Sequence, residues 1–159
     1  MRRSFGRPDL AVAAFGSLVA AVVAAAIHGS SPFAHGAWLV AYLALVGFLA
    51  QALLGAGQSA LLTRNTLSRL SREVRVAQTA LWSLGVVTVP LGVLSETRLL
   101  VVIGSVSLIA ALISFWISIR RTLAPTKAGW LPRAYAALLA GLMASVFVGT
   151  ALAWDLPWV

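Results

Sequence analysis

Residues 99–119 read LLVVIGSVSLIAALISFWISI, a stretch without a single charged side chain. A bilayer hydrocarbon core about 30 Å thick is crossed by a helix of roughly 20 apolar residues, so this stretch is typical of a transmembrane helix. Comparable apolar stretches cover residues 10–27, 34–56, 77–94 and 133–154. The sequence therefore predicts an all-α integral membrane bundle of five transmembrane helices, organised as a single transmembrane domain over residues 1–159.

Composition agrees with a chain that lies mostly in lipid. Hydrophobic residues make up 60% of the chain and charged residues only 10%, whereas soluble domains carry about 25% charged residues. Cysteine is absent, which excludes disulfides and thiolate chemistry. The net charge of +8 comes from basic residues that lie between the apolar stretches, so we read them as topology signals and expect no nucleic-acid partner.

The basic residues predict the orientation of the spans, because cytoplasmic loops retain Lys and Arg. With the N-terminus in the cytoplasm and the C-terminus outside, only Arg98 lies outside; the cytoplasmic residues are Arg2, Arg3, Arg7, Arg64, Arg69, Arg72, Arg75, Arg120, Arg121, Lys127 and Arg133. Tryptophan favours the headgroup level, and the same topology places Trp38, Trp154 and Trp158 outside and Trp82, Trp116 and Trp130 inside. We therefore expect a multi-pass protein of the bacterial cytoplasmic (inner) membrane.

A basic cytoplasmic loop is expected over residues 58–76, where arginines alternate with apolar residues at near-helical spacing. Such a segment can lie as a helix along an anionic leaflet. A solvated loop explains the same residues equally well, and the sequence leaves both interpretations open.

Small residues repeat at every fourth position in several spans, and membrane helices associate through such ridges. The predicted packing residues are Gly16, Ala20 and Ala24 in the first span, Gly47, Gln51 and Gly55 in the second, and Ala137, Gly141, Ser145 and Gly149 in the fifth. Packing within the bundle is the favoured interpretation. Self-association, or docking onto other membrane subunits, is the alternative.

His28 and His35 are the two histidines, and both are expected at the outer ends of their helices. A neutral imidazole facing a bundle can ligate iron or copper. His28 continues the ridge of the first span. At about 100° per residue, His35 shares a helix face with Leu39, Tyr42 and Val46, roughly opposite the Gly47 ridge. A snorkelling or hydrogen-bonded histidine is the plainer alternative for each.

Other polar residues narrow the function classes. Gln51 lies near the middle of the second span, so its amide needs a partner, and a structural hydrogen bond between helices is the expected one. No acidic residue lies at mid-depth in any predicted span, which argues against a proton-coupled transporter. Neither a phosphate-binding loop nor a catalytic triad is found, so we expect no enzyme activity from the chain alone.

One part of the chain resembles the catalytic subunit of heme-copper oxidases. The residues that carry this resemblance are Ser31 to Trp38, Gly47-Phe48 and Gly55-Ala56-Gly57, followed by Leu81 to Gly85, Gly92, Gly104 and Phe115. In that family a histidine at the start of an inward-running helix ligates the low-spin heme, which implies a heme b ligand role for His35. The copper-binding histidines and the high-spin heme ligand of the family have no counterpart, so the resemblance implies no oxygen reduction.

These observations lead to ordered hypotheses. The first is a small membrane subunit or accessory protein that binds heme b through His35, with His28 as a candidate second axial ligand, and that is associated with respiratory electron transfer. The second is a cofactor-free structural subunit of a larger membrane complex. A small-solute transporter comes third.

Overall fold

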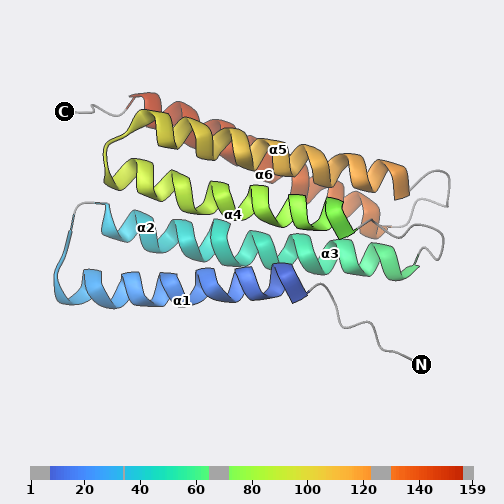
Figure 1. The fold of residues 1–159 in the computed structure, drawn as a ribbon, viewed down its shortest axis with the longest axis horizontal. Helices are drawn as coiled ribbons and strands as arrows, with labels where there is room; N and C mark the ends of the chain where they lie inside the picture. Colours follow the sequence, from blue (N-terminus) through green and yellow to red (C-terminus); the bar gives the residue numbers. More distant parts are fainter. Residues whose placement is uncertain (1–7, 34, 65–71, 123–129, 156–159) are drawn as a thin grey trace. The chain divides into compact units, whose positions relative to one another are not determined.

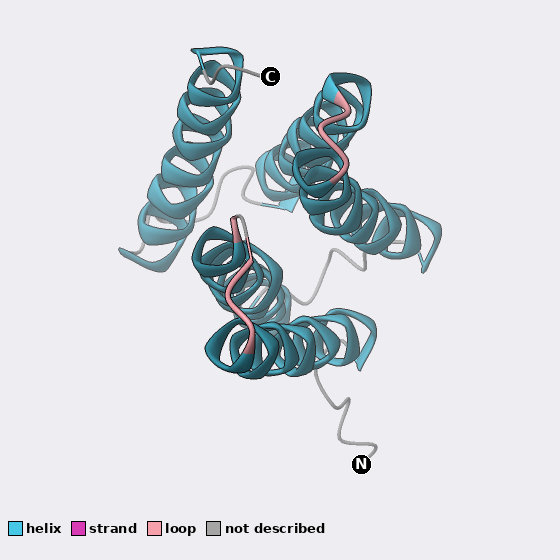
Figure 2. Cartoon of the chain, turned by 90° about the vertical axis from the view of Figure 1, so that its left-hand side faces the viewer, coloured by secondary structure: helices cyan, strands magenta, loops and turns pink. Residues whose placement is uncertain are grey.

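The structure, a computed structural model, describes residues 8–33, 35–64, 72–122 and 130–155. Helix is the only regular secondary structure in these residues (Figures 1 and 2). Five helical stretches are long and apolar enough to cross a membrane: Leu10–Ser30, Gly36–Leu61, Glu73–Leu94, Arg98–Arg120 and Trp130–Val148. The prediction of an all-helical chain with five such stretches is confirmed.

The chain divides into two compact units, Met1–Thr63 and Arg64–Val159. The sequence analysis expected one domain, and each unit is described here by itself.

In the first unit, two antiparallel rods pack side by side (Figure 1). Helix α1, Pro8–Ser30, begins at a proline, which suits a helix start because its missing N–H has no intrahelical acceptor there. The second rod consists of α2, Gly36–Tyr42, the π-helix η1, Leu43–Ala50, and α3, Gln51–Arg64. Both α2 and η1 pack against α1.

The π-helix η1 decides which residues of the second rod face α1. In a regular α-helix, the 19 steps from Gly36 to Gly55 would turn the two glycines about 100° apart. A π-helix closes i→i+5 hydrogen bonds and so turns less per residue. As a result both glycines face α1: a Cβ on Gly55 would lie 3.3 Å from the Leu10 Cβ, and a Cβ on Gly36 would collide with the His28 ring.

The helical wheel used for the second span is therefore wrong beyond Tyr42. That wheel assumed about 100° per residue throughout, whereas the residues after Tyr42 follow the wider π-helical turn. The shared face proposed for His35 and Val46 consequently does not hold.

The second unit contains three helices: α4, Arg72–Leu94, α5, Arg98–Thr122, and α6, Trp130–Asp155. Helix α4 continues through Pro90, and α5 packs against both α4 and α6. The basic segment predicted over 58–76 is divided in the structure. Residues 58–64 belong to α3 and residues 72–76 to α4, while residues 65–71 lie outside the described part of the chain.

A tight turn joins α4 to α5. Thr97 N–H donates to the Gly92 carbonyl at 2.8 Å, and Glu96 N–H donates to the Val93 carbonyl at 3.3 Å. This is the hydrogen-bond pattern of a Schellman helix end, in which the residue after the cap is left-handed. Glu96 occupies that position with φ 53°, where glycine would carry no steric penalty.

The seam between α4 and α5 forms the core of the second unit. Its positions are spaced alternately by three and four residues, as in an antiparallel pair of knobs-into-holes helices. The α4 positions are Arg75, Gln78, Trp82, Gly85, Val89 and Gly92, and the α5 positions are Val101, Gly104, Leu108, Ala111, Phe115 and Ser118. Every one of them is buried except Arg75, which is half-buried.

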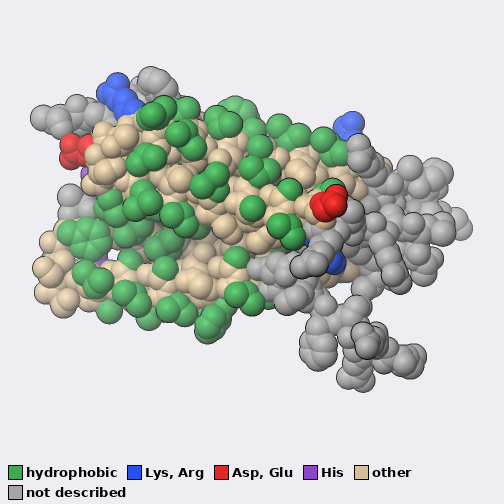
Figure 3. Space-filling model, viewed as in Figure 1, with side chains coloured by type: hydrophobic (Ala, Val, Ile, Leu, Met, Phe, Trp, Pro, Cys, Tyr) green, Lys and Arg blue, Asp and Glu red, His purple; other side chains and the backbone are tan. Residues whose placement is uncertain are grey.

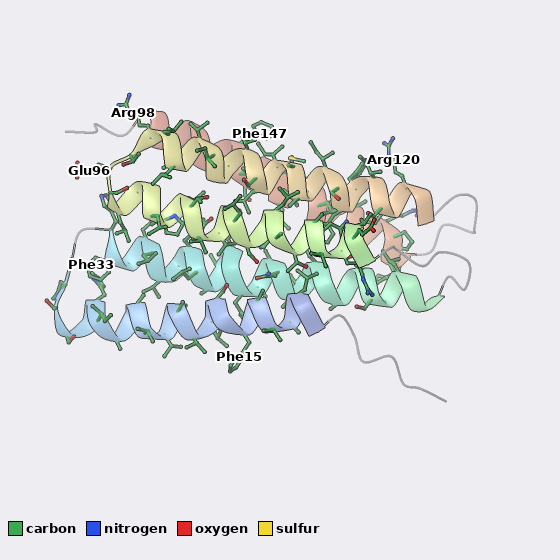
Figure 4. The ribbon with its side chains drawn as sticks, in the orientation of Figure 1. Phe15, Phe33, Glu96, Arg98, Arg120 and Phe147 are labelled. Carbon is green, nitrogen blue, oxygen red and sulfur yellow. The ribbon has the colours of Figure 1, made fainter. Side chains whose placement is uncertain are left out.

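Apolar side chains cover the outside of the helices, and charges lie toward their ends (Figure 3). Phe15 on α1 is 65% exposed and Phe147 on α6 is 58% exposed. Figure 4 shows Glu96 and Arg98 at one end of the α4–α5 hairpin and Arg120 at the other. This distribution is what a lipid environment requires, because lipid tails solvate apolar side chains and the headgroups accept charged ones.

Candidate functional site

His28 organises the connection between α1 and α2. Its Nδ1 accepts a hydrogen bond from the Phe33 N–H at 3.4 Å. The two rings meet edge to face, with centroids 5.3 Å apart and an interplanar angle of 88°. The imidazole also lies against Gly36, where no side chain fits. His28 thus acts as a packing and capping residue of the loop.

These contacts do not fit a heme held by two histidines. Because Nδ1 accepts a hydrogen bond, the neutral His28 ring carries its proton on Nε2. Axial ligation through Nε2 would move that proton to Nδ1, where it would face the Phe33 N–H, and two donors would oppose each other. A ligand role for His28 therefore requires a different loop conformation.

His35 lies at the start of α2 under different conditions. Its backbone is left-handed, with φ 60° and ψ 9°, and it is the N-cap residue of the helix. Its carbonyl accepts a hydrogen bond from the Leu39 N–H at 2.9 Å. The side chain is exposed, and its ring has no hydrogen-bond partner among the described residues. Histidine is one of the residue types enriched in this backbone region, so the conformation alone indicates no function.

No metal cluster accompanies the histidines in the described residues. No group of three or more His, Cys, Asp or Glu side chains is found there that could hold an ion. One turn into α2, Trp38 and Tyr42 stack with ring centroids 5.2 Å apart and an interplanar angle of 22°. The described side chains around His35 are thus aromatic and apolar.

The predicted packing residues fall into two groups. Gly47, Gln51, Gly55 and Ala24 are buried, whereas Gly16, Ala20, Ala137, Gly141 and Ser145 are exposed, and the side-chain environment of Gly149 lies outside what the structure describes. Nothing lies within 4 Å of a Cβ built on Gly16 or on Gly141. The ridge of α6 therefore makes no close contact within the described chain, contrary to the favoured interpretation of packing inside the bundle.

Geometry explains why the α6 ridge is exposed. Helix α6 buries Tyr135 and Leu139, which are 3% and 2% exposed. Ala137 and Gly141 each follow a buried residue by two positions, a rotation of about 200° around the helix. The ridge thus lies on the side of α6 opposite its buried face.

The close glycine packing of this chain occurs instead between α4 and α5. A Cβ on Gly85 would lie 2.9 Å from the Gly104 carbonyl oxygen, and one on Gly92 would lie 2.7 Å from the Val101 backbone nitrogen. A Cβ on Gly104 would lie 2.9 Å from the Val89 backbone nitrogen. The sequence analysis did not assign these glycines to packing. The seven-residue spacing of Gly85 and Gly92 was the available signal, since it keeps both on one seam.

Two buried donors have no acceptor among the described residues, namely Gln51 Nε2 and Trp82 Nε1. Their side chains are each 1% exposed. The hydrogen bond between helices expected for Gln51 is thus not made by this nitrogen in the described chain. Trp82, expected at the inner headgroup level, lies instead in the α4–α5 seam, nine residues after Glu73 begins the candidate span. That prediction was wrong because Trp82 packs against α5.

A single polar bridge crosses the seam among the described hydrogen bonds between side chains of α4 and α5. Gln78 Nε2 donates to Ser118 Oγ at 2.9 Å, and Ser118 Oγ in turn donates to the Ser114 carbonyl at 2.7 Å. On the outer face of α5, the Arg120 guanidinium lies 5.3 Å from the centre of the Trp116 ring. The polar contacts of the second unit thus gather at the end where α4 begins and α5 ends.

Comparison with protein-family models, with curated proteins and with solved structures found no match to this chain. The resemblance to heme-copper oxidases therefore stands on the quoted residues alone.

Proposed function

We propose that the chain is a multi-pass protein of the bacterial cytoplasmic membrane. The support is five apolar helices whose outward side chains are large and hydrophobic, such as Val12 at 71% and Val148 at 59% exposed. Soluble proteins rarely expose contiguous apolar surface on this scale.

The proposed orientation has the N-terminus in the cytoplasm and the C-terminus outside. Support comes from the basic residues at the ends of α4, α5 and α6, which would remain on the cytoplasmic side. The α4–α5 turn, with Glu96 and Arg98, would face outward. Reporter fusions after Arg7 and after Val159 test this orientation, and both in one compartment would refute it.

Within that membrane, the chain is a cofactor-free structural subunit that packs against a helix of another membrane subunit. The observation that carries this proposal is the exposed ridge of α6, where Ala137, Gly141 and Ser145 lie in the open. In the α4–α5 seam the same chain uses glycines to bring helix backbones together, and small residues serve this purpose at membrane helix interfaces generally.

Cysteine cross-linking tests the packing proposal cleanly, because the chain has no cysteine of its own. Ala137→Cys, on the ridge, is expected to cross-link to a neighbouring subunit in native membranes. Phe147→Cys, exposed on the same helix but off the ridge, is the matched control. Adding Gly141→Leu should abolish the Ala137→Cys product by filling the ridge.

The outcomes separate the alternatives. A product of twice the chain's mass identifies self-association, and a product of another mass identifies a different subunit. Equal cross-linking from both positions, or no effect of Gly141→Leu, would refute a specific interface on the ridge.

A heme-binding accessory protein of respiratory electron transfer is the second candidate, favoured by the exposed, unpaired ring of His35. Its test is the absorption spectrum of the purified chain. A reducible Soret band that is lost in His35→Ala and retained in His28→Ala would support single-ligand heme binding by His35. A colourless preparation from heme-replete cells would exclude it.

A further inference from the structure

Charge is strongly unbalanced at one end of the second unit. The start of α4, the end of α5 and the start of α6 meet there (Figure 1). The basic residues at that end of the sequence are Arg64, Arg69, Arg72, Arg75, Arg120, Arg121, Lys127 and Arg133, and the one acid beside them is Glu73. The unit cannot neutralise this end with its own carboxylates.

Arg75 is the basic residue most strongly committed to this end. It occupies the first position of the α4 seam, one turn before Gln78, and it is half-buried. Its Nε is fully buried and has no hydrogen-bond partner among the described residues. A buried guanidinium nitrogen without an acceptor is costly, so an acceptor from outside the described chain is expected.

Glu73 does not supply that acceptor. Residues two apart on a helix point in nearly opposite directions, so Glu73 and Arg75 do not face each other. The Glu73 side chain is exposed, and the described residues contain no ion pair between the two. The helix dipole adds to the need, because a cation near the first turn of a helix is unfavourable.

Depth in the membrane identifies the kind of acceptor. Arg75 lies in the first turn of the candidate span that begins at Glu73. Trp116, at the same end of α5, packs under Arg120, and tryptophan and arginine together are typical of the headgroup level. The anions at that level of a bilayer are lipid phosphates.

We propose that this end of the second unit binds the phosphate of an anionic phospholipid in the adjacent leaflet, with Arg75 as the central contact. The site extends the proposed function and rests on its first part, the insertion of the chain in a membrane. It is independent of the α6 ridge and of any cofactor. Arg120 contributes from the exposed side of α5 as a weaker, long-range attraction.

Native mass spectrometry of the detergent-solubilised full chain tests the proposal. Phosphatidylglycerol is titrated against phosphatidylcholine, and bound lipid is counted for the wild type, Arg75→Gln, Arg75→Lys and Arg98→Gln. Each basic residue near an anionic surface contributes roughly fivefold in affinity. Arg75→Gln should therefore lose at least about fivefold in phosphatidylglycerol affinity, with phosphatidylcholine binding unchanged.

The other variants fix the interpretation. Arg75→Lys keeps the charge and should retain most of the affinity, which separates charge from misfolding. Arg98→Gln, at the opposite end of the hairpin (Figure 4), should bind as the wild type does. Equal losses in Arg75→Gln and Arg98→Gln, or none in either, would overturn the proposal.

Two further arms protect the assignment. If millimolar inorganic phosphate displaces phosphatidylglycerol, the site binds free phosphate and the lipid assignment is wrong. A chain that fractionates with membranes but shows no preference for phosphatidylglycerol refutes the lipid site while leaving membrane insertion intact. A chain recovered outside the membrane refutes both.

Discussion

Replacing Gly104 by alanine should loosen the α4–α5 hairpin. The added Cβ would lie 2.6 Å from both Thr88 Oγ1 and Val89 Cγ2, and 2.9 Å from the Val89 backbone nitrogen. Nonbonded carbon atoms prefer separations of about 3.5–4.0 Å. Rotation of side chains cannot relieve the backbone contact, so the two helices must move apart by about 1 Å.

The expected cost follows from opposing contributions. Overpacking a well-packed interface costs about 1–3 kcal/mol, and a contact with backbone falls toward the upper end. Alanine offsets up to about 1 kcal/mol of this through its better helix propensity. We therefore expect Gly104→Ala to lower the free energy of unfolding by about 2 kcal/mol, or roughly thirtyfold in the unfolding equilibrium.

Equilibrium unfolding in mixed micelles, by titration with sodium dodecyl sulfate, measures this change. Tryptophan fluorescence is a suitable signal because Trp82 is buried in the same seam. Gly141→Ala is the matched control, since nothing lies within 4 Å of its added Cβ. It should leave stability unchanged or raise it slightly through helix propensity.

The comparison decides whether close packing of α4 and α5 is real. Equal effects of Gly104→Ala and Gly141→Ala would show that the seam tolerates a methyl group. The reasoning from backbone proximity would then be refuted.

Further predictions concern the turn, the polar bridge and the His28 loop. Glu96→Gly should raise the free energy of unfolding by about 1 kcal/mol by relieving the left-handed backbone, whereas Glu96→Ala should give no gain, and equal effects in the same titration would contradict this. A double-mutant cycle of Gln78→Leu and Ser118→Ala should yield a coupling of about 0.6 kcal/mol and at most about 1.7, while strict additivity would deny the hydrogen bond. Gly36→Ala should destabilise the first unit because its methyl group would enter the His28 ring, and hydrogen exchange at the α1–α2 connection should increase; unchanged protection would exclude this contact.

Helix number and type were predictable because apolar runs of this length have few alternatives. Residues 99–119 became α5 almost unchanged, extended to Arg98–Thr122. The start of α4 was missed because Arg72 to Val76 is too polar to belong to an apolar run. Those residues nevertheless extend the helix as its first turn.

The candidate site was only partly predictable, because sequence spacing does not state which neighbour a helix face meets. The α6 ridge was recognised from Gly141 and its spacing, but its exposure depends on Tyr135 and Leu139 having taken the buried side. His28 was expected to point inward along its ridge. Its partners, Phe33 and Gly36, are loop and helix-start residues that periodicity cannot place.

The π-helical segment Leu43–Ala50 has a consequence for how the length of this chain can vary. From Gly36 to Gly55 the rod contains about one residue more than a regular α-helix needs to point both glycines the same way, since 18 α-helical steps complete five turns. A chain shortened by one residue between Leu43 and Ala50 would regularise its hydrogen bonds and still present both glycines to α1. The same deletion within α1 would rotate half of that helix by about 100° and expose its buried face. Single-residue gaps among any relatives are therefore expected at η1 rather than elsewhere in the first unit.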